Sequence, residues 1–131
     1  MNKPNPKANQ MDRLRQPVNI YNVLNVSHYG GDVDAVIERH GVWMLVDVKK
    51  IGKMPEPQQI RHYRELCDAL NAIGKPCVYV VSWHRNIDPD EVVELAETQV
   101  ITFYNSEGIH SDNRKFKEFA EWWFTCNGVN V

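Results

Sequence analysis

Residues 30–50 read GGDVDAVIERHGVWMLVDVKK and decide the fold of this chain. Two runs rich in Val, Ile, Leu, Met and Trp flank His40 and Gly41, which predicts a β-hairpin with a two-residue turn there. In that register Asp34 lies directly opposite Asp47. Like charges that face each other destabilise a sheet, so we favour a divalent cation bound between the two carboxylates.

The predicted hairpin has two different faces, because side chains alternate across a strand. One face is apolar and comprises Val33, Ala35, Ile37, Val42, Met44, Val46 and Val48. The other face carries the charges and comprises Asp32, Asp34, Val36, Glu38, Trp43, Leu45, Asp47 and Lys49. The acids and the lysine therefore gather at the open end of the hairpin.

Length and composition limit the class of protein. The 131 residues predict one domain over residues 12–131, preceded by a flexible basic tail over residues 1–11. A content of 43% hydrophobic and 24% charged residues argues against wholesale disorder. No apolar run approaches the roughly 20 residues of a membrane span, and the N-terminus is polar, so we expect a cytoplasmic protein without a membrane partner. Three cysteines without CxxC spacing indicate reduced thiols.

Charge is distributed unevenly along the chain. Residues 1–86 hold 12 Lys and Arg against 8 Asp and Glu, a formal charge of +4, whereas residues 87–131 hold 3 against 9, a formal charge of −6. The basic part contains the hairpin and would become more positive with a bound cation, which is compatible with a phosphate-backbone partner. A solvated charge asymmetry explains the same numbers equally well.

A helix and a second strand are predicted to follow the hairpin. Pro57 suits the first turn of a helix that runs to about Ile73, with apolar residues at helical spacing. The almost wholly apolar run from Pro76 to Trp83 predicts a buried strand. A strand, a helix and another buried strand form a crossover, which places the new strand in the same sheet.

The remaining segments complete an α/β fold. We expect a helix from Asp88 to about Thr98, a strand over Gln99–Tyr104, and a last helix that Ser111-Asp112 caps and that ends near Cys126. The segment 12–25 fits either a short helix or a strand. The predicted architecture is a mixed sheet of four or five strands with helices on both sides.

Five residues carry the predicted chemistry, namely Asp34, Asp47, Lys49, Gln59 and Tyr63. Asp47 and Lys49 are two apart on a strand and share a face, and Gln59 and Tyr63 are four apart on a helix and share a face as well. Two carboxylates and a backbone carbonyl such as that of Val48 suit Mg²⁺ or Mn²⁺. A lysine beside the metal can orient or help to deprotonate an attacking water and offset charge on a phosphorane.

The ordered set of Asp34, Asp47-Val48-Lys49 and Gln59-x-x-x-Tyr63 resembles the core of the PD-(D/E)XK nuclease superfamily. The stretch from residue 31 to residue 81 is similar to the small virus-type replication-repair nucleases, and Gly31-Asp32-Val33-Asp34 also resembles the Gly-x-Ile-Asp of RecB-type exonuclease domains.

The resemblance implies a restriction-endonuclease-like three-layer core and cleavage of DNA in replication, repair, recombination or phage DNA processing. Asp34 and Asp47 would bind Mg²⁺ or Mn²⁺, Lys49 would be the catalytic lysine, and Gln59 and Tyr63 would support the site or contact DNA. Many members of the superfamily also supply an acid or His from an N-terminal helix, and only Asp12 or His28 could take that role here. A core of this size is expected to act as a homodimer or within a larger DNA-processing complex.

Other interpretations stay open for the same residues. Lys49 and the two aspartates can form a structural ion pair, and Asp32 can replace Asp34 as a ligand. Tyr63 fits a core role as well as a functional one. Four basic residues can contact phosphate or remain solvated at the surface, namely Lys50, Lys53, Arg61 and Arg64. His84 follows the buried strand and can either reach the site from the strand end or be a loop residue. A catalytically inactive nuclease fold that binds nucleic acid or protein is the main alternative, and an RNA-directed nuclease is the second.

Overall fold

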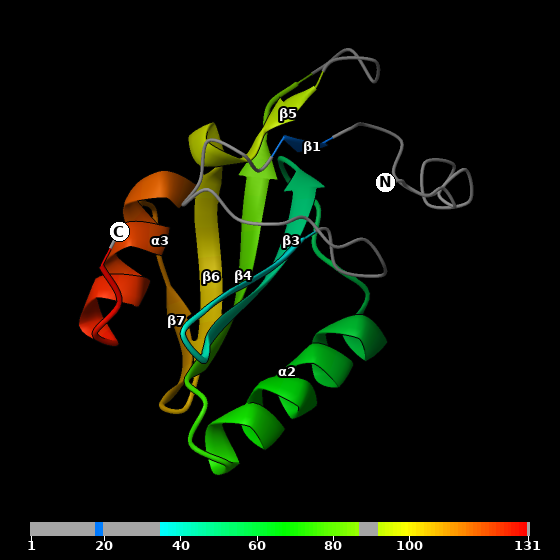
Figure 1. The fold of residues 1–131 in the computed structure, drawn as a ribbon. Helices are drawn as coiled ribbons and strands as arrows, with labels where there is room; N and C mark the ends of the chain where they lie inside the picture. The colour runs from blue at the N-terminus through cyan, green and yellow to red at the C-terminus, as the bar shows by residue number, and fades with distance from the viewer. Residues whose placement is uncertain (1–17, 20–34, 87–91, 131) are drawn as a thin grey trace, which may run out of the picture.

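The computed structural model describes residues 18–19, 35–86 and 92–130. Its elements in chain order are β1 (Val18–Asn19), β2 (Ala35–Arg39), β3 (Val42–Lys50), α2 (Pro57–Ala72), β4 (Cys77–His84), β5 (Val93–Glu94), the 3-10 helix η1 (Leu95–Glu97), β6 (Gln99–Asn105), β7 (Gly108–Ser111) and α3 (Phe116–Cys126). A mixed five-stranded sheet has the order β2-β3-β4-β6-β7, and β1 pairs with β5 in a separate parallel pair. Figure 1 shows the long strands side by side, with α2 and α3 packed beside them.

The predicted hairpin is confirmed for the described residues. Ala35 pairs with Val46 and Arg39 with Val42, which is the register that a turn at His40-Gly41 requires. Both turn residues have positive φ, 53° and 82°, as a two-residue hairpin turn of type I′ demands. Asp32 and Asp34 precede the first described residue of β2, so the predicted pairing of Asp34 with Asp47 lies outside the described residues.

The crossover after the hairpin is also confirmed. Helix α2 begins at Pro57 and ends at Ala72, one residue before the predicted end. Gly74, with φ of 82°, reverses the chain into β4. Strand β4 runs parallel to β3, and their pairing extends from Trp43 opposite Cys77 to Lys50 opposite His84. Strand β3 therefore pairs with β2 on one side and with β4 on the other.

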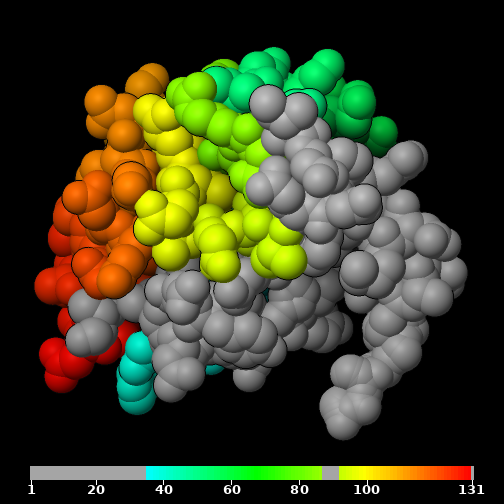
Figure 2. All heavy atoms as spheres, turned by 90° about the horizontal axis from the view of Figure 1, so that it is seen from above, coloured from blue at the N-terminus to red at the C-terminus, as the bar shows by residue number. Residues whose placement is uncertain are grey.

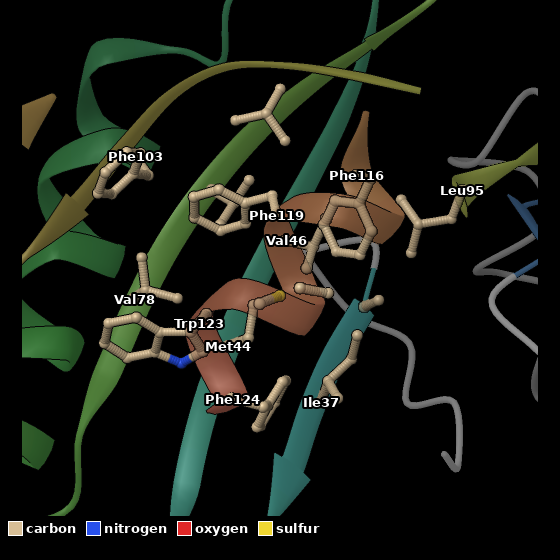
Figure 3. Close-up of a cluster of buried hydrophobic side chains, with 14 of the residues drawn as sticks. Ile37, Met44, Val46, Val78, Leu95, Phe103, Phe116, Phe119, Trp123 and Phe124 are labelled. Carbon is tan, nitrogen blue, oxygen red and sulfur yellow. The ribbon is translucent and has the colours of Figure 1, made fainter. Parts of the chain in front are cut away.

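Two hydrophobic clusters cover the two faces of the sheet. The larger cluster, which we call the α3-side core, lies between the sheet and α3. Figure 3 shows the α3 rings of Phe116 and Phe119 beside Val46 of β3. The smaller one, which we call the α2-side cluster, is formed by the buried residues Leu45, Tyr63, Cys67, Cys77, Tyr79 and Val81. The sheet is thus the middle of three layers. No helix in the described part of the chain has the length and hydropathy of a membrane span.

The predicted helix from Asp88 to Thr98 is wrong in its described part. Val93 and Glu94 form β5, which pairs in parallel with β1, and a single 3-10 turn follows. Val93 and Leu95 are buried in the cluster beneath α3, and an extended step between them reaches that core. Tertiary burial therefore overrides the helix-start signal at Asp88, whose own position lies outside the described residues.

The last helix starts later than predicted, at Phe116, because a fifth strand intervenes. Residues 108–111 form β7, which pairs with β6 across a turn at Ser106-Glu107. The Asp112 carboxylate does not cap the helix; it accepts hydrogen bonds from the backbone N–H of Arg114 at 2.7 Å and from its guanidinium at 2.6 Å. The predicted strand over Gln99–Tyr104 is confirmed as β6.

Candidate functional site

Asp47 occupies a buried position on β3, an interior strand of the sheet. It lies near the end of β3, between neighbours that point into the α3-side core, so its own side chain projects toward α2. The residue is 0% exposed. A buried carboxylate is costly unless hydrogen bonds compensate for its lost hydration, so the neighbours of Asp47 are informative.

Two neutral donors hold the Asp47 carboxylate from two different elements. The side-chain amide nitrogen of Gln59, in the first turn of α2, lies 3.0 Å from each carboxylate oxygen. The hydroxyl of Tyr79, in β4, donates to Oδ2 at 2.6 Å. The carboxylate is therefore fixed by the helix on one side and by the parallel strand on the other.

Tyr79 is the site residue that the sequence analysis missed. It is 2% exposed and lies on the same face of the sheet as Asp47. The sequence contained a usable signal, since Tyr79 is a tyrosine in a mostly apolar buried strand and a buried tyrosine hydroxyl normally has a hydrogen-bond partner. What the sequence did not specify was the register of β4 against β3, which brings this hydroxyl to Asp47.

Tyr63 belongs to the α2-side cluster. It is buried, one helical turn beyond Gln59, and its ring centroid lies 5.7 Å from that of Tyr79. Its ring also makes an edge contact with His62 at 5.1 Å. The structure places Tyr63 as the packing partner of the tyrosine that donates to Asp47, which gives it a core role next to the site.

Lys49 is half-buried and lies two residues after Asp47 on the same side of β3, opposite Trp83 of β4. The side chain of Val48 packs into the α3-side core, so the ligand atom predicted for this residue is its backbone carbonyl oxygen. The structure therefore keeps the predicted Asp-x-Lys pair together on the α2 side of the sheet.

The other predicted cations, Lys50, Lys53 and Arg61, are all exposed, and strand alternation directs Lys50 to the face of the sheet opposite Lys49. Arg61 lines a pocket of about 450 Å³ with Gln59 and Tyr63 along the first half of α2. The carbonyl of Lys53 accepts a hydrogen bond from the indole of Trp83 at 2.7 Å, which fastens the loop after β3 to the end of β4.

His84 is brought to the end of β4 but not to Asp47. Strand alternation places its ring on the opposite face from Tyr79, and its Nδ1 accepts the backbone N–H of Asn86 at 3.2 Å. Burial, together with the nearby charge of Lys50, lowers the pKa of His84 below its ordinary value. The His84 ring is therefore neutral at pH 7 and is held by its hydrogen bond with Asn86.

Figure 2 looks onto this end of the molecule, where the ends of β3 and β4 (green to yellow-green) lie beside the segment leading into β6 (yellow).

The candidate metal ligands among the described residues suit a hard divalent cation. They are the carboxylate of Asp47 and the carbonyl of Val48, both oxygen ligands of the kind that Mg²⁺ and Mn²⁺ take. Gln59 and Tyr79 orient the carboxylate as outer-shell partners orient metal-ligating groups. Within residues 18–19, 35–86 and 92–130, no cluster of three His, Cys, Asp or Glu side chains could hold a metal ion. The other predicted ligands, Asp12, His28, Asp32 and Asp34, lie outside those residues.

Comparisons of the chain with protein-family models, with curated proteins and with solved structures find no match. Its function must therefore be inferred from the site itself.

Proposed function

We propose that the chain is a metal-dependent nuclease of PD-(D/E)XK type that hydrolyses phosphodiester bonds in DNA. The observation that carries the proposal is the contact of Gln59 with both oxygens of Asp47. This contact brings the acid of the Asp-x-Lys pair next to the helix that carries Gln-x-x-x-Tyr. The two motifs must lie together in this way if they form one active site. The layering of α2, the mixed sheet and α3 is consistent with a restriction-endonuclease-like core.

Each residue has a distinct part in the proposed reaction. Asp47 and the carbonyl of Val48, together with Asp34, would hold Mg²⁺ or Mn²⁺. When bound, the cation would supply Lewis-acid activation of water and of the scissile phosphate. Lys49 orients the attacking water through its ammonium group and offsets charge that develops on the phosphorane.

The surrounding residues bind and position. Gln59 and Tyr79 keep the Asp47 carboxylate in one orientation, so that no reorientation is needed when the ligand arrives. Lys50, Lys53 and Arg61 are exposed cations within the more basic part of the chain and would contact the DNA backbone.

Metal binding provides the first test. In a calorimetric titration with Mn²⁺, the wild-type protein is expected to release or absorb heat, and Asp47→Asn, which keeps the shape of the side chain, is expected to give a flat trace. Glu65→Gln, an exposed acid elsewhere on α2, is the matched control and should bind like the wild type. Identical traces for the wild type and Asp47→Asn would contradict the metal site.

Cleavage provides the second test. Plasmid, flap and four-way-junction DNA are incubated with the protein and Mg²⁺, and Lys49→Ala is expected to lose activity while Lys75→Ala, beyond the far end of α2, retains it. Metal binding without cleavage of any substrate would favour a catalytically inactive nuclease fold that binds nucleic acid or protein. Faster cleavage of matched RNA would indicate an RNA-directed enzyme.

A further inference from the structure

Two buried thiols meet beneath helix α2. Cys67 lies in the second half of that helix and Cys77 is the first residue of β4, and both are 0% exposed. Their sulfur atoms are 3.0 Å apart. Cys126, the third cysteine, is exposed on α3, so the pair is chemically distinct from it.

The backbone around the two thiols is held in place by the neighbouring turn. The side-chain amide of Asn71 donates to the carbonyl of Cys77 at 3.2 Å, and its oxygen accepts the N–H of Cys77 at 2.9 Å. The N–H of Lys75 donates to the carbonyl of Leu70 at 3.0 Å and closes the end of the helix. These contacts fix the start of β4 against the last turns of α2, so the closeness of the sulfurs is built into the fold.

We propose that Cys67 and Cys77 form a redox modification site in which the two thiols are oxidised to an intramolecular disulfide joining α2 to β4. A disulfide bond is about 2.05 Å long, so the sulfurs need to approach by only about 1 Å. The site takes a peroxide as its oxidant. This inference is independent of the nuclease proposal.

The reaction balances with hydrogen peroxide as the co-reactant. One thiol attacks the peroxide O–O bond and becomes a sulfenic acid, and the first water leaves. The other thiol then attacks the sulfenic sulfur, the S–S bond forms, and the second water leaves with the hydroxyl oxygen. Each sulfur loses one electron, and the peroxide takes up both. A dithiol reductant reverses the step by thiol–disulfide exchange.

The environment of the pair slows this oxidation. The hydrogen bond with Cys77 and then burial raise the pKa of the Cys67 thiol, which keeps it protonated at neutral pH. An open groove of about 550 Å³ is lined by Asn71, Gly74 and Pro76, which brings solvent to the residue next to Cys77. A water-sized peroxide therefore has a short path to the sulfurs when the end of α2 opens locally.

The disulfide would fix the spacing of the two elements that hold Asp47. Gln59 belongs to α2 and Tyr79 to β4, and Tyr79 lies two residues beyond Cys77 on the same face. Closing the loop between the two cysteines removes freedom from the unfolded chain, so the oxidised protein is expected to melt up to about 10 °C higher.

The test uses the Cys126→Ser protein, which leaves only the buried pair. The folded protein is exposed to hydrogen peroxide, unfolded in denaturant, and alkylated, and its peptides are identified by mass spectrometry. We expect two thiols to be lost together, a peptide linked between Cys67 and Cys77, and full recovery after dithiothreitol. The same protein oxidised while unfolded shows that the chemistry works under these conditions.

Either of two results would overturn the proposal. In the first, both thiols of the folded protein remain open to alkylation after a treatment that links them in the unfolded protein. In the second, the thiols are converted separately to sulfinic acids, without a linked peptide. Cys67→Ser and Cys77→Ser, each on the Cys126→Ser background, serve as controls and must give no intramolecular link. Because the readout is thiol chemistry, failure here would not bear on nuclease activity.

Discussion

Removing one hydroxyl, in Tyr79→Phe, tests whether the Asp47 carboxylate is held as the structure describes. The hydroxyl lies 2.6 Å from Oδ2 of a completely buried acid. Hydrogen bonds to a charged group contribute about 1.5–3 kcal/mol, and loss of a partner in the interior lies at the upper end of that range. We therefore expect Tyr79→Phe to lower the free energy of unfolding by about 2–3 kcal/mol.

Urea denaturation followed by tryptophan fluorescence measures this loss as a lower midpoint with an unchanged slope. Tyr104→Phe is the matched control, because its hydroxyl also donates to an aspartate, Asp68, at 2.7 Å, but at an exposed position. That substitution should cost less than about 1 kcal/mol, since water replaces the lost partner.

A double-mutant cycle isolates the pair from other effects of each substitution. Tyr79→Phe, Asp47→Asn and the double variant are compared with the wild type in the same urea experiment. A coupling energy of about 1.5 kcal/mol or more is expected. A coupling below about 0.5 kcal/mol, or equal losses in Tyr79→Phe and Tyr104→Phe, would refute the reasoning that these two elements clamp Asp47.

Three further outcomes can be measured. Gln59→Leu removes the amide that contacts both Asp47 oxygens, and Mn²⁺ affinity by calorimetry should fall at least about 10-fold; unchanged affinity would contradict the proposed support. Phe119→Ala empties a fully buried position beneath α3 and should cost about 3–5 kcal/mol in urea, whereas a loss below about 1 kcal/mol would contradict that packing. The lowered pKa of His84 means that the unfolded state takes up its proton first, so wild-type stability should fall as pH drops below about 6.5; His84→Asn should flatten this dependence, and an identical pH profile would contradict it.

Local pattern alone determined the hairpin and the crossover. The alternation of residues 42–48 fixed which side chains of β3 face each cluster, and the positive φ required at His40-Gly41 fixed the register of its partner strand. The helical spacing of Tyr63 and Cys67 likewise identified the face of α2 that packs on the sheet. These features depend on neighbours within one element or one turn, which a sequence displays directly.

Long-range pairing decided the rest. The segment from Val93 to Glu97 carries a good helix-start signal upstream but becomes β5 and a 3-10 turn, because burying Val93 and Leu95 beneath α3 outweighs local propensity. Residues 108–111 form β7 because β6 offers an edge to pair with.

The site shows the same division. The sequence supplied Asp47 and Gln59 as candidates, but only the register of β4 against β3 brings the Tyr79 hydroxyl to the carboxylate. The same packing of α2 on β4 places the sulfurs of Cys67 and Cys77 in contact. Both contacts join residues of separate elements. Their distances are therefore set by how the layers pack, and the spacing of residues along the chain does not reveal them.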